Sequence, residues 1–398
     1  MGLSSEINLS LVNNTTLAQT INIMGSVTPQ GFANNSNDLY EYDLSSDSFI
    51  NLSSVTILIA TSPDPTFVAY TAPVQSDNVE GIVYALNTLN KGIFQNSGDI
   101  VYVSGSDYSY SNLVVNSSTS NSIILGTTGT APNGIAIDSS GNVYTANYAS
   151  NNVSKITPYG VSTILGSTGT NPVAIVVDSS GNVYTANYTS FNVTKITPLG
   201  ASTTLGGTGD FPTGIIIDNS GNIYTSNSGT DDVTKITPLG VSTTLGTTGN
   251  APNAITIDSA GNIYTANGGS DNVTKITPLG VSTPLGSTGS SPNGITIDSA
   301  GNIYTANLGS DNVSKITPLG VSTILGLTPS RPVDITIDAS GNIYTTNDFN
   351  NNVSKITPLG VSTIFGTTGS TPNGITIDTS GNIYTSNSIS NNVSKITP

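Results

Sequence analysis

Two columns of titratable side chains recur along this chain at a fixed spacing of 40 residues. They are Asp138, Asp178, Asp218, Asp258, Asp298, Asp338 and Asp378, and Lys155, Lys195, Lys235, Lys275, Lys315, Lys355 and Lys395. Brought together in a ring, seven carboxylates could hold a cation. Alternatively, each Asp caps a tight turn, and each Lys covers a neighbouring repeat with its stem while the ammonium stays in water. Sevenfold repetition favours the structural interpretation, because a functional site usually breaks the regularity of its scaffold. We therefore predict no metal and no cofactor.

Residues that break the repetition are the candidates for binding. They occur in loops that differ from repeat to repeat, and they are Tyr148, Tyr188, Phe191, Asp210, Phe211, Arg331, Asp334, Asp348 and Phe349. Aromatic and amide-rich loops over a rigid scaffold suit a sugar or a protein surface. Two alternatives stay open: the loops have drifted because no special backbone geometry constrains them, and Arg331 with Asp334 forms only a local salt bridge.

The composition excludes several kinds of chemistry. The 398 residues include no Cys, no His and no Trp, and only 8% are charged. A Ser-His-Asp triad, a His base, a Cys-ligated zinc and a disulfide framework are therefore absent, and we predict no catalytic residue and no enzyme. The net charge of −15 with 9 basic residues is unfavourable for nucleic acid. No apolar run reaches the ~20 residues of a membrane helix, and the N-terminus shows no secretory signal.

The 40-residue repeat predicts the architecture. Each unit has four short β-type runs, in one unit at 241–245, 254–258, 262–267 and 272–277, separated by turn sequences. Four strands in about 40 residues, repeated, indicate the blades of a β-propeller. The array begins at 122–126 with a sequence like the 241–245 run, which would be the outer strand of a blade. It ends at 392–398 with a sequence like the 272–277 run, which would be the third strand. We therefore predict seven four-stranded blades over 119–398, closed by the strand at 122–126 pairing into the last blade.

A sequon, Asn-Val-Ser or Asn-Val-Thr, opens the run that begins at Asn272 and its equivalents, six repeats in all, and Asp232 interrupts it in another. It is either a ladder of glycosylation sites or simply the start of a strand; the missing secretory signal favours the second interpretation.

The repeated string Pro-x-Gly-Ile-x-Ile-Asp-x-x-Gly-Asn-Ile-Tyr-Thr-x-Asn, followed by Asn-Val-x-Lys-Ile-Thr-Pro-x-Gly, resembles the NHL repeat and the related propellers of streptogramin lyases. The resemblance covers 278 of 398 residues and implies a seven-bladed propeller. Its activities do not carry over. The streptogramin lyases and the zinc-dependent amidating lyases use a His that this chain lacks, and similar sugar lactonases use a Glu, whereas Glu6, Glu41 and Glu80 all precede the repeats.

Residues 1–118 do not share the repeat. Alternating strand patterns and one segment of helical spacing at 77–89 predict a small α+β domain, which carries ten acidic residues against Lys91. A domain of this size ahead of a repeat array suggests an anchor that carries a display head.

We therefore expect a non-enzymatic virion protein of the capsid decoration or tail-fibre type, assembled in the host cytoplasm. Residues 1–118 would attach to capsid or tail proteins, and the propeller would bind a surface glycan or a host receptor. Two alternatives remain: a secreted or cell-surface adhesin or lectin, and a metal-dependent propeller hydrolase or lyase, which the absence of His disfavours. Neither nucleic acid nor membrane insertion is expected, and homo-oligomerisation is left open.

Overall fold

The computed structural model describes residues 121–398 and, ahead of them, the backbone of eight strands. These are β1 (Ser4–Asn13), β2 (Ala18–Ser26), β3 (Leu39–Asp43), β4 (Ser48–Leu52), β5 (Thr56–Ala60), β6 (Phe67–Thr71), β7 (Gly81–Leu86) and β8 (Lys91–Gln95). The chain divides into two compact units, Met1–Thr119 and Ser120–Pro398.

In the first unit, strands pair in the order β2-β1-β7-β8, and β3-β4 and β5-β6 form two further hairpins. The helix predicted over 77–89 is wrong at its centre, because residues 81–86 form strand β7 between β1 and β8. The run Ile82-Val83-Tyr84 explains the difference, since β-branched and aromatic residues favour strands. Strands β1, β2 and β5 lie where alternating strand patterns are expected, and the expected attachment of residues 1–118 to other proteins stays a prediction.

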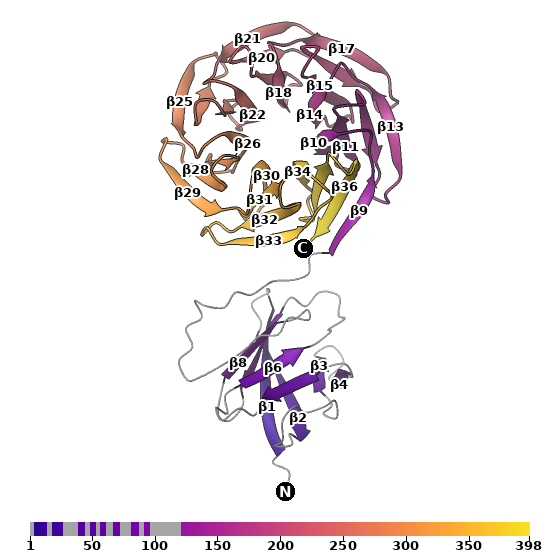
Figure 1. The fold of residues 1–398 in the computed structure, drawn as a ribbon, viewed down its shortest axis with the longest axis vertical. Coiled ribbons are helices and arrows are strands. Elements are labelled where there is room, and N and C mark those ends of the chain that lie inside the picture. Colours follow the sequence, from indigo (N-terminus) through magenta and orange to yellow (C-terminus); the bar gives the residue numbers. More distant parts are fainter. Residues whose placement is uncertain are drawn as a thin grey trace. The chain divides into compact units, whose positions relative to one another are not determined.

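The second unit is a ring of seven four-stranded antiparallel sheets within residues 121–398 (Figure 1). The innermost strands are β10 (Pro132–Ile137), β14 (Pro172–Val177), β18 (Pro212–Ile217), β22 (Pro252–Ile257), β26 (Pro292–Ile297), β30 (Pro332–Ile337) and β34 (Pro372–Ile377). The second strands are β11 (Val143–Asn147), β15 (Val183–Asn187), β19 (Ile223–Asn227), β23 (Ile263–Asn267), β27 (Ile303–Asn307), β31 (Ile343–Asn347) and β35 (Ile383–Asn387). The third strands are β12 (Asn152–Ile156), β16 (Asn192–Ile196), β20 (Asp232–Ile236), β24 (Asn272–Ile276), β28 (Asn312–Ile316), β32 (Asn352–Ile356) and β36 (Asn392–Thr397). The outer strands are β13 (Ser162–Ser167), β17 (Ser202–Gly207), β21 (Ser242–Thr247), β25 (Ser282–Ser287), β29 (Ser322–Leu327), β33 (Ser362–Thr367) and β9 (Asn121–Thr127).

The predicted closure is confirmed. Strand β9, from the start of the array, pairs antiparallel with β36 at its end, with Ser122 opposite Ile396 and Ile124 opposite Ser394. The last blade thus has the order β34-β35-β36-β9. Closure removes the two open sheet edges that an unclosed array would expose to other chains.

The core lies between blades. A typical cluster joins Tyr264, Ala266 and Val273 of one blade with Ile295 and Ile303 of the next. The second strand of every blade is buried along its whole length, because a neighbouring blade covers each of its faces. Each fully buried Ile or Val contributes about 1.5–3 kcal/mol. Stability is therefore shared around the ring, and no single blade holds the core.

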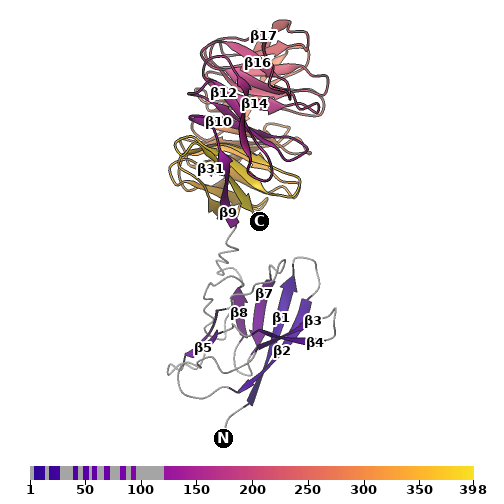
Figure 2. The same ribbon diagram turned by 90° about the vertical axis from the view of Figure 1, so that its right-hand side faces the viewer.

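The alternating strand direction divides the loops between two faces, which lie on opposite sides when the ring is seen edge-on (Figure 2). We call one the scaffold face; it consists of turns 138–142 and 157–161 and their equivalents in the other blades. We call the other the variable face; it consists of loops 148–151 and 168–171 and their equivalents. Turn sequences on the scaffold face are nearly the same in every blade, whereas those on the variable face differ.

Candidate functional site

The aspartate column caps turns of the scaffold face. Asp258 Oδ1 accepts hydrogen bonds from the backbone N–H groups of Ala260 (3.0 Å) and Asn262 (2.8 Å). Its Oδ2 accepts from the Asn262 side chain (2.7 Å) and from the Tyr264 hydroxyl (2.9 Å). The same four bonds recur at the equivalent Asp of every blade in the described ring, as at Asp138. These carboxylates are committed to the turn, as the structural interpretation predicts.

Partial burial raises the pKa of Asp258, but the hydrogen bonds outweigh it and hold that pKa below the usual value. The same direction and causes apply to Asp138, Asp178, Asp218, Asp298 and Asp378. Burial and the adjacent carboxylate raise the pKa of Tyr264 well above its usual range. The hydroxyl therefore stays protonated and keeps donating to Asp258.

The lysine column places its ammonium groups over tyrosines of its own blade. Lys275 is opposite Tyr264 in the pairing of β24 with β23, and its Nζ lies 5.7 Å from the ring centroid. The corresponding distances in the other blades run from 5.5 to 5.8 Å. Because the register puts Lys beside Tyr in one sheet, each blade carries an Asp–Tyr–Lys stack, a cation–π arrangement with a structural role.

Sequence reasoning missed a buried polar network beneath the variable face. The Asn267 side chain donates to Asn272 Oδ1 (2.7 Å) and to Thr274 Oγ1 (2.9 Å), and its own Oδ1 accepts from Thr265. The equivalent Asn is fully buried in every blade from residue 122 onward. The signal was present in the sequence, since an Asn ends each Gly-Asn-Ile-Tyr-Thr-x-Asn string.

This network also accounts for the sequon. Its Asn, as at Asn272, is used as an oxygen acceptor for the buried Asn. Asp232 interrupts the sequon yet accepts the same bond from Asn227 at 2.6 Å. An acceptor oxygen is therefore what the position uses, which favours the structural interpretation over a glycosylation ladder.

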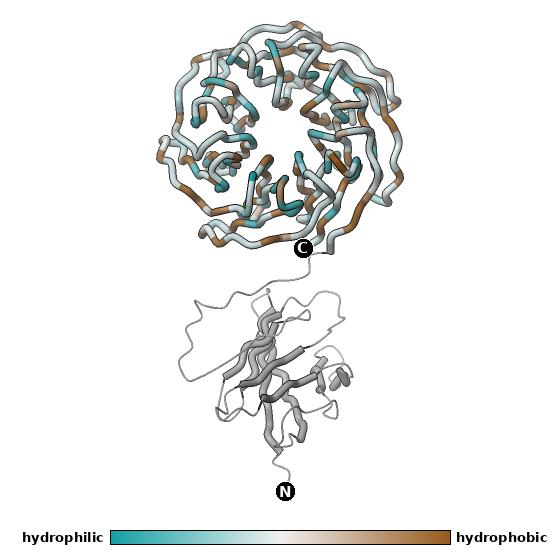
Figure 3. Tube along the Cα trace, viewed as in Figure 1, coloured by the Kyte–Doolittle hydropathy of each residue, from teal (hydrophilic) through white to brown (hydrophobic). Residues whose placement is uncertain are grey.

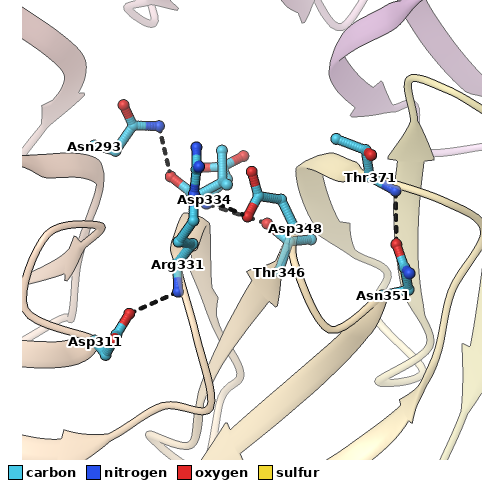
Figure 4. A network of polar contacts seen from close by, with 9 residues as sticks. Asn293, Asp311, Arg331, Asp334, Thr346, Asp348, Asn351 and Thr371 are labelled. Carbon is cyan, nitrogen blue, oxygen red and sulfur yellow. Dashed lines mark hydrogen bonds and ion pairs between the residues drawn. The ribbon is translucent and has the colours of Figure 1, made fainter.

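A second set of bonds links consecutive blades across the variable face. Asp311 Oδ1 accepts from the backbone N–H of Arg331 (2.7 Å), and Asn351 Oδ1 from that of Thr371 (2.8 Å) (Figure 4). Equivalent bonds start from Asn151, Asp231, Asp271 and Asn391. These acceptors have a positive φ, a conformation in which Asn and Asp are the favoured non-glycine residues.

In the described ring, Phe191 replaces the bridging Asn or Asp at one junction. Its φ of 51° matches the others, but its side chain offers no acceptor. The ring instead makes a T-shaped contact with Phe211 of the next blade, with centroids 5.1 Å apart. Tyr188 lies 5.0 Å from Phe211 in a tilted contact. We call Tyr188, Phe191 and Phe211 the aromatic junction.

The aromatic junction is accessible and has space made for it. Phe211 is 38% exposed, and Tyr188 and Phe191 are half-buried. Gly229 lies against Phe211, and a Cβ at that position would come within 2.6 Å of the ring carbon Cδ2. Asp210, the neighbour of Phe211 in the chain, is exposed. Four of the predicted binding residues therefore gather at one blade junction.

Arg331 pairs with Asp348 and not with Asp334. The Arg331 Nε lies 3.3 Å from Asp348 Oδ1, and this pair and its neighbours are drawn in Figure 4. Asp334 instead accepts from the backbone N–H of Ile335 (2.9 Å) and from that of Ile375 in the next blade (3.0 Å). Burial raises the pKa of Asp334 to about 6, although both hydrogen bonds oppose this. Burial also raises the pKa of Asp348, against the lowering effect of the Arg331 charge.

The remaining predicted residues do not join the aromatic junction. Tyr148 is half-buried in the first blade, and its carbonyl accepts from the Asn171 side chain. Phe349 is 75% exposed beside Asp348 in the sixth blade. The predicted residues thus form two groups in different blades, with Tyr148 apart from both.

Charge is divided unequally between the two faces of the ring. The Asp and Lys columns, seven residues each, lie at the scaffold face and cancel. The other seven Asp residues after residue 120 lie in or within three residues of the variable-face loops, with Arg331 as the counter charge. The variable face is therefore acidic and the scaffold face is neutral.

Within residues 122–398, no three Asp, Glu, His or Cys side chains form a group that could hold a metal ion. In the part of the chain that the structure describes, no helix has the length and hydropathy to cross a bilayer.

Comparison with solved structures finds the same fold in other proteins. A streptogramin B lyase superposes with a TM-score of 0.61 at 19% identity, over 69% of this chain and 96% of that one. A catalytically inactive histidine-to-alanine variant of virginiamycin B lyase from Staphylococcus aureus, with quinupristin, gives 0.61 at 20% identity, over 70% and 98%. The WD40 propeller domain of Doa1 gives 0.59 at 10% identity, over 70% and 97%.

Identities at this level show a shared fold alone. No curated protein sequence matches the chain. A family model described as the virginiamycin B lyase family does match, over residues 118–396, which is nearly the whole propeller. The expected resemblance to streptogramin-lyase propellers is confirmed: the chain belongs to the virginiamycin B lyase family.

Proposed function

We propose that this member of the family is a non-enzymatic display protein whose propeller binds a protein or glycan surface through the variable face. The observation that carries the proposal is the aromatic junction. Three residues that break the repeat at separate sequence positions, Tyr188, Phe191 and Phe211, meet at one accessible place. Aromatic side chains give binding surfaces large apolar contact area with little loss of side-chain entropy.

The absence of histidine supports a binding role over lyase activity. The catalytically inactive variant of virginiamycin B lyase that shares this fold carries a histidine-to-alanine change. This chain has no histidine at any of its 398 positions. Its repeated carboxylates are used in turns, where each is held by four hydrogen bonds and is not free to act as a base.

The setting that we propose is a virus particle, in which residues 1–118 attach to capsid or tail proteins and the propeller is the exposed head. Support comes from the scarce charge and the Ser, Thr, Asn and Gly richness, and from a first unit without the repeat ahead of the array. The second candidate is a secreted or cell-surface adhesin. It shares the same binding face and differs in what residues 1–118 attach to.

Fractionation of particles tests the setting. The full chain should be found in purified particles at a fixed ratio to the capsid protein, and its recovery only as free protein in the host cytoplasm would contradict a virion role. A glycan array probed with the full chain tests the head. Comparison with a variant carrying Tyr188→Ser, Phe191→Asn and Phe211→Ala, residues that other blades hold at these positions, shows whether binding depends on the aromatic junction.

A further inference from the structure

The scaffold face carries a circle of exposed apolar side chains. The turn after each third strand, from the first blade to the sixth, places one of them at its tip: Tyr159, Leu199, Leu239, Leu279, Leu319 and Leu359, which are 92–98% exposed. Two residues later come Val161, Val241, Val281, Val321 and Val361, which are 57–60% exposed. We call these eleven side chains the apolar ring. Figure 3 shows hydrophobic segments recurring around the outer strands of the propeller.

The turn itself does not require leucine. In the turn that starts at Thr277, the Gly280 N–H donates to the Thr277 carbonyl (2.8 Å), Pro278 sets the first corner and Gly280 takes a φ of 84°. Leu279 occupies the remaining corner, a position that accepts most residue types. Its side chain points into solvent, so neither turn geometry nor core packing explains an apolar residue there. The same turn of six blades thus places an exposed apolar residue on one face, and apolar groups gathered on one face are a mark of an interaction surface.

The charges of the two faces favour one way of covering the apolar ring. The variable face is acidic, so two variable faces repel. The scaffold face holds equal numbers of Asp and Lys, and each Lys is already placed over a Tyr of its own blade. Two scaffold faces can therefore meet without a net repulsion.

The available area is that of a stable interface. An apolar side chain of this size offers about 60–120 Å² for burial. With the exposures given above, the apolar ring offers about 500–1,000 Å² per copy, compared with about 800 Å² per partner in a standard interface. The blade-to-blade spacing of the apolar ring is the same in a second copy. When one ring is laid face to face on a second copy so that the seventh blades lie opposite each other, the six turns of one copy meet the six turns of the other, as in an isologous twofold interface.

We propose that two copies of this chain associate back to back through the apolar ring and leave both variable faces exposed. Such a dimer would present two binding faces in opposite directions and raise the avidity for a surface that carries many ligands.

Sedimentation velocity of the full chain tests this proposal. The wild type should have twice the chain mass of 40.5 kDa, and a variant with Asp at all six turn tips should have half the mass of the wild type. The control carries Phe349→Asp and Ile389→Asp, which replace apolar side chains 75% and 70% exposed on the variable face, and it should keep the wild-type mass. A circular dichroism melt shows that each variant is folded. A wild type of single-chain mass at 100 µM, or an Asp variant with the wild-type mass, would overturn the proposal.

A mixing experiment distinguishes a second copy from an unrelated partner. The variant with Lys at all six turn tips should also have half the wild-type mass. Because the two apolar rings face each other, the Lys and Asp variants should pair when mixed and restore the mass of two chains. If the mixture stays at the mass of the separate variants, the face-to-face arrangement is wrong.

Discussion

Replacing Phe191 with asparagine is expected to leave the stability of the propeller nearly unchanged and to weaken binding. The residue is in a loop of the second blade where other blades hold Asn or Asp at the same positive φ. In those blades the side chain accepts a bond from the backbone N–H 20 residues ahead, at 2.7 or 2.8 Å. Phe191→Asn therefore exchanges an aromatic contact for a bond that the backbone is already placed to make.

The opposing contributions nearly cancel. Loss of the T-shaped contact with Phe211 costs about 0.5–1.5 kcal/mol, and lost burial of the half-buried ring costs about 1 kcal/mol. The new hydrogen bond contributes about 0.5–1.5 kcal/mol, and Asn relieves about 1 kcal/mol of strain at positive φ. The free energy of unfolding should stay within about 1.5 kcal/mol of the wild type. Phe191→Ala, which provides neither ring nor acceptor, should lose about 1.5–2.5 kcal/mol.

Urea unfolding followed by circular dichroism measures the difference. With a slope of about 3 kcal/mol/M, the midpoint of Phe191→Asn should move by less than about 0.5 M, and that of Phe191→Ala should fall further. A drop in the Asn variant as large as that in the Ala variant would refute the reasoning, because it would mean that the aromatic junction is a packing core and not a surface kept for a ligand.

Three further outcomes follow from the hydrogen bonds and the charges. Asp258→Ala should cost about 2–4 kcal/mol in thermal or urea unfolding, because it uncaps a turn and leaves the buried Tyr264 hydroxyl unpaired; a loss below 1 kcal/mol would contradict the capping role. The pKa of Asp334 is raised to about 6, so its charge destabilises the fold increasingly as the pH rises from about 4 to about 6. Asp334→Asn should exceed the wild type in stability by up to about 3 kcal/mol at pH 7, and the difference should vanish near pH 4; a constant difference would argue against this assignment. Arg331→Ala removes the partner of the largely buried Asp348 carboxylate and should lower the free energy of unfolding by about 1–3 kcal/mol, while weakening any ligand held at that group; unchanged affinity would remove Arg331 from the binding face.

The repeat was sufficient to predict the blades, their number and their closure. Strand sequences at fixed spacing define the sheets, and the phase of the array required β9 to pair with β36. The capping role of the Asp column was also predictable, because an Asp ahead of a Gly turn bonds nearby amides. The strand at 81–86 was not predictable, because Ile82, Val83 and Leu86 fit both a helical spacing and a strand. Pairing with β1 decides between the two.

Contacts between blades could not be predicted from sequence patterns. That Asn151 bonds the backbone of residue 171 depends on two loops from different blades meeting, which no local spacing reveals. For the same reason a salt bridge between Arg331 and Asp334, the nearer residue in sequence, was one of the open alternatives, whereas the loop that carries Asp348 brings the real partner. The aromatic junction was predicted residue by residue, but its assembly was not. Phe191 is the residue that indicates the aromatic junction in the sequence, because it is an aromatic in a column of Asn and Asp.

The most direct test of the account compares the binding of the full chain and of the aromatic-junction variant, Tyr188→Ser with Phe191→Asn and Phe211→Ala, to the surface that the wild type recognises on an array or on host cells. Biolayer interferometry measures both affinities, and the unfolding midpoints are measured alongside. Loss of three aromatic anchors of about 1–2 kcal/mol each predicts an affinity at least about a hundredfold weaker at a similar midpoint. Equal affinities would contradict the claim that this propeller binds through the junction at which its repeat is broken.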